Sequence, residues 1–76
     1  MIKLYKEKIE LITLKDVQEF VSIVSAINGN IYLKDGNDFC VSAKSIMGAI
    51  AALEWNNLYC YSEEDISYEI NRFIVD

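Results

Sequence analysis

Few side chains in this sequence can do chemistry, and they are not spaced as a reaction centre requires. The chain has no histidine and two cysteines, Cys40 and Cys60, neither with a CxxC partner. A zinc site needs four Cys or His ligands, so none can be assembled here. No nucleophile stands beside a base and a group that orients that base. We therefore expect no catalytic residues, no metal and no cofactor, and we interpret both cysteines as small buried hydrophobes.

The acidic run Glu63-Glu64-Asp65 and the tyrosines have structural explanations. Consecutive helix residues point in different directions and do not converge on one ion, whereas acids at the start of a helix favour the positive end of its dipole. Tyrosines in strands and helices usually serve packing, which is our interpretation of Tyr59, Tyr61 and Tyr68.

The segment that begins at Ser45 is the most informative. Ser45 precedes an uncharged run, Ile46 to Leu53, with four alanines or glycines, which is typical of a short helix. Ser45 is placed to cap this helix, and a phosphate on it would meet free N–H groups. The helix has more apolar residues than one buried face can hold. We therefore expect some of them to form an exposed protein-binding patch. The alternative is that Ser45 is only a cap and the helix only core.

Turn-forming pairs and strand-like segments divide the rest of the chain. The pairs are Asn28-Gly29, Asp35-Gly36 and Asn56-Asn57. Four segments are predicted as strands: Met1 to Ile12, Ile31 to Leu33, Phe39 to Ser42 and Trp55 to Tyr61. The polar stretch Lys34 to Asp38 predicts a hairpin turn between the middle two.

Two amphipathic helices are predicted before and after this hairpin and the Ser45 helix. Thr13 and Asp16 form a T-x-x-D start, and apolar residues then recur at helical spacing: Val17, Phe20, Val21, Val24 and Ile27. Ser62 and the acids after it predict a closing helix with its own apolar stripe: Ile66, Ile70, Phe73 and Ile74. The order βαββαβα predicts one α+β domain over residues 1–76, with a four-stranded antiparallel sheet covered on one face by three helices.

The charge pattern argues against several kinds of partner. The net charge is −5, and the seven bases are scattered along the chain: Lys3, Lys6, Lys8, Lys15, Lys34, Lys44 and Arg72. Nucleic-acid binding needs a clustered basic face. The apolar stretches are far shorter than the ~20 residues that span a bilayer, and no signal region follows the N-terminal lysines. We expect a cytoplasmic protein that binds neither nucleic acid nor membrane.

The residues Lys44-Ser45-Ile46-Met47-Gly48 resemble the regulatory serine segment of HPr, the phosphocarrier of the bacterial phosphoenolpyruvate-dependent sugar phosphotransferase system. All five match in order, and the predicted elements before and after them fit the HPr fold, an open-faced sandwich, from Lys3 to Phe73. The resemblance implies Ser45 as a regulatory phosphorylation site. It also implies a partner-binding surface around that serine, made of Lys44, Ile46, Met47, Gly48 and Ile50. Gly48 would allow close approach of another backbone or side chain.

The resemblance breaks where HPr carries its phosphoryl group. HPr has a histidine at the start of its first helix, an arginine two residues later and then a proline, whereas this chain has Thr13, Lys15 and Asp16. A phosphate ester on Thr13 would have too low a transfer potential to pass its phosphate on. Imidazole, in contrast, is the side chain that acts as a nucleophile near neutral pH without separate activation. We expect no histidine phosphotransfer, and we interpret Thr13 as a helix cap and Lys15 as a solvated charge.

The chain is also similar to the catabolite-repression HPr-like proteins, which lack the histidine and keep the serine. Their serine is phosphorylated by a bifunctional kinase/phosphorylase, which promotes binding to a LacI-type transcription regulator. The resemblance therefore implies a regulatory protein-binding module, with a phosphotransferase-system enzyme, HPr kinase or a transcription regulator as its partner. Lys15 departs from this branch, which has arginine there. Two alternatives stay open: an interaction or structural protein that reuses the fold, for example a homodimer joined through Ile46 to Leu53, and a residual phosphotransferase component with another phosphoacceptor, such as an aspartate.

Overall fold

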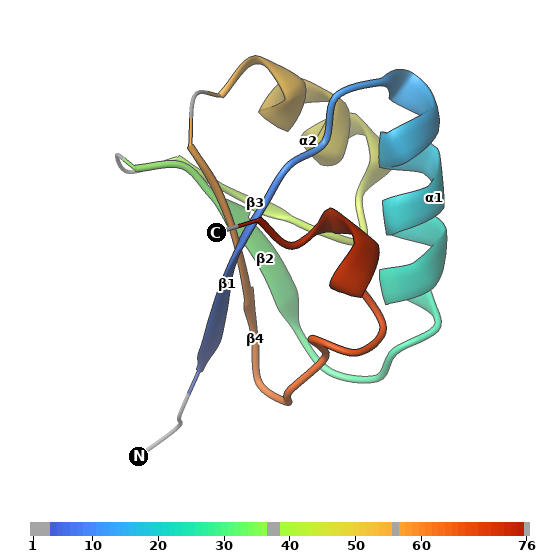
Figure 1. Ribbon diagram of the computed structural model, residues 1–76, viewed down its shortest axis with the longest axis vertical. Helices are drawn as coiled ribbons and strands as arrows, with labels where there is room; N and C mark the ends of the chain where they lie inside the picture. The colour runs from blue at the N-terminus through green and yellow to red at the C-terminus, as the bar shows by residue number, and fades with distance from the viewer. Residues whose placement is uncertain (1–3, 37–38, 56, 76) are drawn as a thin grey trace.

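A computed structural model describes residues 4–36, 39–55 and 57–75 of the chain. Its elements, shown in Figure 1, are β1 (Tyr5–Ile9), α1 (Leu14–Ser25), β2 (Ile31–Lys34), β3 (Cys40–Ser42), α2 (Ile46–Ala51), a 3-10 helix (Ala52–Glu54), β4 (Leu58–Ser62) and a second 3-10 helix (Asn71–Phe73). Several predictions lie partly outside the described residues: the first strand at 1–3, the hairpin turn at Asn37 and Asp38, and both the last turn pair and the fourth strand at Asn56.

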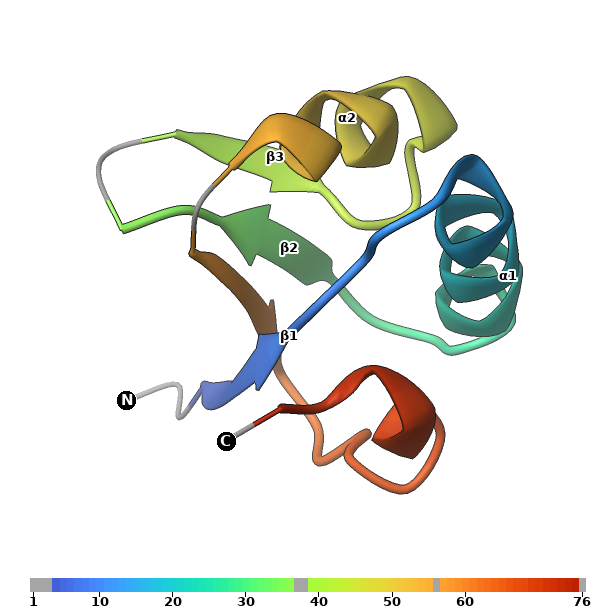
Figure 2. The same cartoon turned by 45° about the horizontal axis from the view of Figure 1, so that its top comes forward.

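The four strands form one antiparallel sheet in the order β1-β4-β2-β3. The central strand β4 pairs with both β1 and β2, and β3 extends the sheet as the second strand of the predicted hairpin. Figure 2 shows α1, α2 and the C-terminal 3-10 helix on the same side of this sheet. The predicted α+β class and the four-stranded antiparallel sheet are therefore confirmed.

Helix α1 begins after Thr13 as its sequence predicts, but it ends at Ser25, two residues before Ile27, the last residue of the predicted stripe. Its apolar stripe is buried, from Val17 and Phe20 to Val24. After the helix, Gly29 has a φ of 98°, a left-handed conformation that glycine adopts without steric cost. The Asn28-Gly29 pair therefore turns the chain from α1 into β2.

The core lies between the sheet and these helices. Strand residues that point toward the helices are buried, among them Leu33, Leu58 and Cys60. Against them pack the stripe of α1 and the C-terminal segment, where the Phe73 ring meets the Phe20 ring edge-on at a centroid distance of 5.4 Å. The sheet thus buries one face and leaves the other for solvent.

The predicted closing helix is not an α-helix. Ser62 ends β4 as a buried strand residue, and its hydroxyl donates to the carbonyl of Glu64. The chain then forms turns over 67–70 and the short 3-10 helix Asn71–Phe73. Ile66, Ile70 and Phe73 are still buried, so most of the predicted apolar stripe packs as expected without the predicted helix. Tyr68 is 90% exposed, which corrects our interpretation of it as a packing residue. Two α-helices of the described residues, not three, cover the sheet, together with the short 3-10 helix.

The reason for this difference lies in the last residues that the structure describes. Ile74 forms a bridge with Ile9, the backbone N–H of Val75 donates to the carbonyl of Lys8, and that of Glu10 donates to the carbonyl of Phe73. The chain must therefore return to the edge of β1 directly after Phe73. A continuing α-helix would carry these residues away from that edge.

The two cysteines point to opposite sides of the sheet. Cys60 is buried, as expected, and its burial together with nearby Glu7 raises the pKa of its thiol to about 12. Cys40 is exposed, which corrects our interpretation of both as buried. Among the described helices, none is both long and apolar enough to cross a membrane.

Candidate functional site

Ser45 caps α2 as its sequence predicts. The residue has an extended backbone (φ −94°, ψ 118°), its hydroxyl oxygen accepts from the N–H of Gly48 at 3.2 Å, and its carbonyl accepts from the N–H of Ala49 at 2.9 Å. Ser45 is itself exposed. The capping role and access for a modifying enzyme are therefore compatible at this residue.

Helix α2 buries Ala49 and turns its large apolar residues outward. Ala49 and the following Ala52 are fully buried. Ile46, Met47 and Ile50 are 44%, 81% and 42% exposed, and together they form what we call the α2 patch. This arrangement is the reverse of an ordinary amphipathic helix, which keeps its large apolar side chains for the core. Contiguous exposed apolar residues of this kind mark interaction surfaces.

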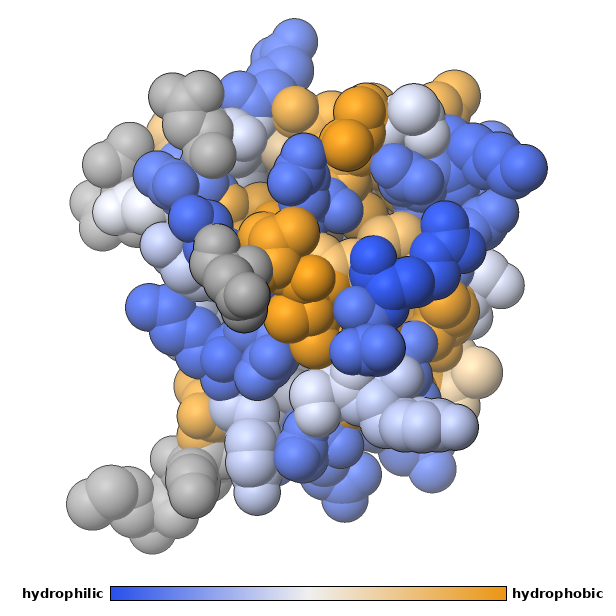
Figure 3. All heavy atoms as spheres, in the orientation of Figure 1, coloured by the Kyte–Doolittle hydropathy of each residue, from blue (hydrophilic) through white to orange (hydrophobic). Residues whose placement is uncertain are grey.

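The start of α1 extends the apolar surface toward the α2 patch. Ile12 and Leu14 are also exposed, Ile12 to 71%, and α1 packs directly against α2. Figure 3 shows hydrophobic residues reaching the surface near α2 and the start of α1, at the top of that view. A hollow of about 570 Å³ lies beside them, and Ile12, Leu53 and Trp55 contribute to its lining. The surface is therefore broader than the segment that the sequence singled out.

Lys44 and Gly48 serve the chain's own packing. The ammonium of half-buried Lys44 donates to the carbonyl of Ile27, just beyond the end of α1, where a positive charge is favourable. A Cβ on Gly48 would lie 3.0 Å from the Cβ of Val41, so the close approach that this glycine allows is that of β3. Both residues fix α2 in place, and the exposed apolar side chains are left as the accessible part of the segment.

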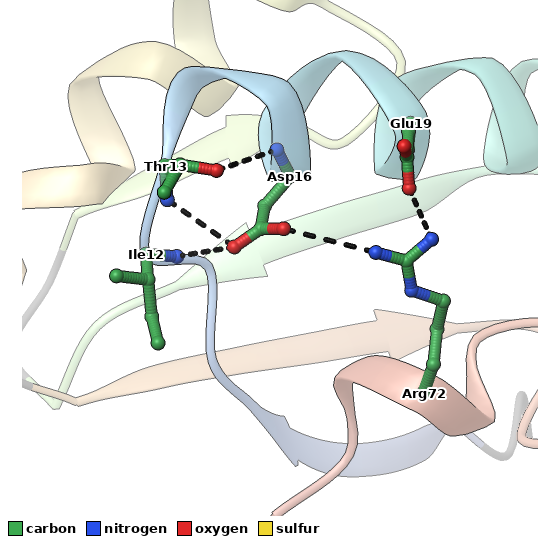
Figure 4. A network of polar contacts seen from close by, with 5 residues as sticks. All are labelled: Ile12, Thr13, Asp16, Glu19 and Arg72. Carbon is green, nitrogen blue, oxygen red and sulfur yellow. Dashed lines mark hydrogen bonds and ion pairs between the residues drawn. The ribbon is translucent and has the colours of Figure 1, made fainter.

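Thr13 and Asp16 form a complete capping box at the start of α1, drawn in Figure 4. The Thr13 hydroxyl accepts from the N–H of Asp16 at 3.1 Å, and one Asp16 carboxylate oxygen accepts from the N–H groups of Ile12 and Thr13 at 3.0 and 3.2 Å. These bonds, with the Arg72 guanidinium nearby, lower the pKa of Asp16. Thr13 is confirmed as a helix cap, and Lys15 beside it is exposed.

The acids after β4 hold loops and do not start a helix, which corrects the expectation that they favour the positive end of a helix dipole. A Glu63 carboxylate oxygen accepts from the N–H of Asn30 at 3.0 Å. Asp65 accepts from both the N–H and the hydroxyl of Ser67, which lowers the pKa of Asp65. Within residues 4–36, 39–55 and 57–75, no three Cys, Asp or Glu side chains group as a metal site would require.

One group of residues on the open face of the sheet was not predicted from the sequence. Lys6 and Lys8 on β1, Lys34 on β2 and three tyrosines on β2 and β4 all lie on the sheet face away from the helices. Residues at i and i+2 of a strand share a face, so alternation contained this information: Lys6-Glu7-Lys8, Tyr32-Leu33-Lys34 and Tyr59-Cys60-Tyr61. What it could not supply was the strand order that joins the three pairs.

Comparison of the chain with protein-family models, with curated proteins and with solved structures finds no match.

Proposed function

We propose that this protein is a regulatory protein-binding module of the HPr type that presents the α2 patch to a protein partner and does not transfer phosphate through histidine. The observation that carries this proposal is the outward position of Ile46, Met47 and Ile50 on a helix whose inward side is alanine. Burying these side chains against a partner would add to binding at about 25 cal/mol per Å² of apolar surface, less the cost of association.

The arrangement of elements supports the HPr part of the proposal. A first strand and helix, a hairpin, the Ser45 helix and a fourth strand follow one another as in the family's order, and the strands form one antiparallel sheet. In this proposal the turns and 3-10 helix after β4, which bury Ile66, Ile70 and Phe73, take the place of the family's third helix. The start of α1, with Thr13 and Lys15 in place of the histidine and arginine, borders the same surface.

Regulation in this proposal occurs at Ser45. A phosphate there would add about two negative charges beside the positive end of α2, and directly next to Ile46 and Met47. A charge in that position favours partners with basic groups and disfavours purely apolar ones. The proposed modifying enzyme is an HPr kinase/phosphorylase, and the proposed partner of the modified form is a LacI-type transcription regulator.

Incubation with an HPr kinase and ATP, followed by mass spectrometry of peptides, tests the regulatory part. We expect phosphate on Ser45 and none on the Ser45→Ala variant, with a genuine HPr as the positive control. Ser42, which is exposed on β3, provides a check of selectivity. An unmodified Ser45 under conditions that modify the genuine HPr would remove the switch from the proposal.

A charge in the α2 patch tests the binding part. Binding of the chain to immobilised HPr kinase/phosphorylase should be lost or weakened at least tenfold by Met47→Asp. Tyr68→Asp is the matched control, because Tyr68 is 90% exposed and lies outside the patch. Equal affinities of the two variants would show that binding does not use the α2 patch.

A homodimer joined through Ile46 to Leu53 is the second candidate, favoured by the same exposed apolar surface. Sedimentation equilibrium distinguishes the homodimer from the first candidate. If the chain forms a dimer that Met47→Asp dissociates, and if it does not bind the kinase, the α2 patch serves self-association. The remaining alternative, a phosphotransferase component with an aspartate acceptor, requires labile phosphate on the chain after incubation with enzyme I and phosphoenolpyruvate.

A further inference from the structure

The sheet face that points away from the helices carries lysines and tyrosines side by side. Strand pairing places Lys6 opposite Tyr61 and Lys8 opposite Tyr59. From β2, Tyr32 lies opposite Tyr61, and Lys34 lies opposite Tyr59. We call these six residues the tyrosine–lysine face. In Figure 2, no described helix covers this side of the sheet.

The tyrosine–lysine face is basic although the chain is acidic. No acid occupies an outward position on the described strands, and the two outward residues of β3 are Cys40 and Ser42. Glu7, which lies between the two lysines of β1, points to the other side of the sheet, opposite Cys60. Three lysines therefore gather on one surface of a chain whose net charge is −5. This separation of charge attracts an anionic ligand to this face.

Each lysine ammonium that contacts a ring lies close above it. The Lys6 ammonium is 4.4 Å from the Tyr59 ring centroid and 5.9 Å from the Tyr61 centroid, and the Lys34 ammonium is 4.9 Å from the Tyr61 centroid. Tyr32 is exposed, and Tyr59 and Tyr61 are half-buried. A flat ligand that stacks on the Tyr59 or Tyr61 ring would displace an ammonium from above that ring and keep it alongside as a positive charge.

We propose that the tyrosine–lysine face binds single-stranded nucleic acid. Bases stack on Tyr32, Tyr59 and Tyr61, and the phosphates between them lie against Lys6, Lys8 and Lys34. Aromatic side chains on an open sheet are the usual platform for unpaired bases, and lysines beside them neutralise the backbone. An acidic protein surface is a less suitable ligand, because it would bind the lysines but would not use the three neighbouring rings.

This proposal departs from the expectation that the chain avoids nucleic acid. That expectation rested on bases scattered along the sequence, but pairing of β1, β4 and β2 brings three of them onto one face. The tyrosine–lysine face lies on the opposite side of the sheet from α2. Nucleic-acid binding and partner binding through the α2 patch can therefore be tested independently.

Fluorescence anisotropy tests the proposal with a short labelled oligothymidylate, an oligouridylate and a duplex of the same length. We expect binding of a single strand with a Kd of about 10⁻⁴ to 10⁻⁶ M and weaker binding of the duplex, whose bases cannot stack on the rings. The two single strands distinguish DNA from RNA. Three neutralised phosphates predict a loss of about 20-fold in affinity between about 50 and 200 mM salt.

Variants separate stacking from simple charge. Tyr61→Ala should weaken binding at least about fivefold, because each stacked base contributes substantially, and Tyr61→Leu repeats the test with a bulkier strand residue. Lys34→Gln should weaken binding and reduce the salt dependence. The control is Lys15→Gln, which makes the same charge change at an exposed position of α1 and should leave affinity unchanged. Circular dichroism checks that each variant is folded.

Three results would overturn the proposal: no binding of either single strand at 10⁻⁴ M protein, about the weak limit for such complexes; equal loss of affinity in Lys15→Gln and Lys34→Gln; or equal affinity for single strand and duplex. Self-association that Lys34→Gln abolishes, without oligonucleotide binding, would instead assign the face to a second copy of the chain.

Discussion

The two thiols of the chain differ in access, and burial changes the ionisation of Cys60. Cys40 is exposed on the outer side of β3, whereas Cys60 is buried in β4, where burial and nearby Glu7 raise the pKa of its thiol to about 12. Since thiolate is the reactive form of cysteine, these environments separate the two residues chemically.

We expect Ellman's reagent at about pH 8 to modify Cys40 at once and Cys60 only after unfolding. The native Cys40→Ser variant should therefore show no rapid reaction, while Cys60→Ser should retain one reactive thiol. The raised pKa also means that stability contributed by the protonated Cys60 falls as pH rises from about 8.5, the ordinary cysteine value, toward 12. Two equally reactive thiols in the native protein would contradict the burial of Cys60.

The Asp16 carboxylate makes the start of α1 sensitive to pH. The N–H groups of Ile12 and Thr13 and the charge of Arg72 hold the pKa of Asp16 below its ordinary value, so the folded state favours the ionised form. The stability from these bonds is therefore fully present above about pH 4 and is lost as pH falls through the lowered pKa.

Asp16→Asn should consequently lower the free energy of unfolding at pH 7, and the difference from the unchanged protein should shrink toward pH 2. Urea titrations at several pH values measure this. Thr13→Ala, which removes the other half of the capping box, should cost about 1 kcal/mol at either pH, because a hydroxyl does not titrate there. A difference for Asp16→Asn that is constant with pH would show that its charge is not involved.

At the scale of elements, the contact between α2 and β3 depends on Gly48. Alanine is the better helix former by about 0.8–1 kcal/mol, so helix propensity alone favours Gly48→Ala. A Cβ there would, however, lie 3.0 Å from the Cβ and 3.3 Å from the Cγ2 of Val41. The Val41 Cβ cannot rotate away, so relief requires movement of α2 or β3.

We therefore expect Gly48→Ala to destabilise the protein, by about 1–3 kcal/mol, which is the usual cost of overpacking. Ala51→Gly, at an exposed position of the same helix, measures the helix-propensity effect without a contact. Both free energies come from thermal or urea unfolding. A more stable Gly48→Ala protein would mean that β3 moves aside at little cost.

Local patterns were enough to predict the elements whose signals lie within a few residues of one another. The T-x-x-D start and the stripe after it predicted α1, Ser45 and the alanine-rich run predicted α2, and Gly29 marked the turn before β2. The predicted closing helix is wrong because turns and a 3-10 helix bury Ile66, Ile70 and Phe73 as well as an α-helix would. What decided between them was the return of Ile74 to Ile9, a contact between distant residues that periodicity does not encode.

At the scale of the whole molecule, the sheet separates two surfaces of different character. On the helical side, Ile46, Met47 and Ile50 project outward as the sequence predicted, because a helix of small residues leaves its large ones exposed. The packing roles of Lys44 and Gly48 could not be predicted, because the contacts of Lys44 with Ile27 and of Gly48 with Val41 join different elements. The tyrosine–lysine face depends on the order of the strands in the sheet, so it could not be predicted from the sequence either.

A chain of 76 residues has little stability to spare. At about 0.05–0.15 kcal/mol per residue, its free energy of unfolding should be on the order of 4–11 kcal/mol. Phe73 closes the core from the C-terminal segment, where it is buried against Phe20 and directly precedes the residues that bridge to β1. Loss of its ring should therefore affect the entire fold, not just this segment.

Phe73→Ala should remove about 3–5 kcal/mol, a large part of the total, and lower Tm by at least about 12 °C. Arg72→Ala is the neighbouring control: its guanidinium is more than half exposed and pairs with Asp16 and Glu19 at the surface, contacts that contribute about 0–1 kcal/mol. Calorimetry of the two variants gives both Tm values. Similar small losses would mean that the C-terminal segment is an appendage to the core, whereas a much larger loss for Phe73→Ala would show that the sheet and α1 depend on this segment to fold as one unit.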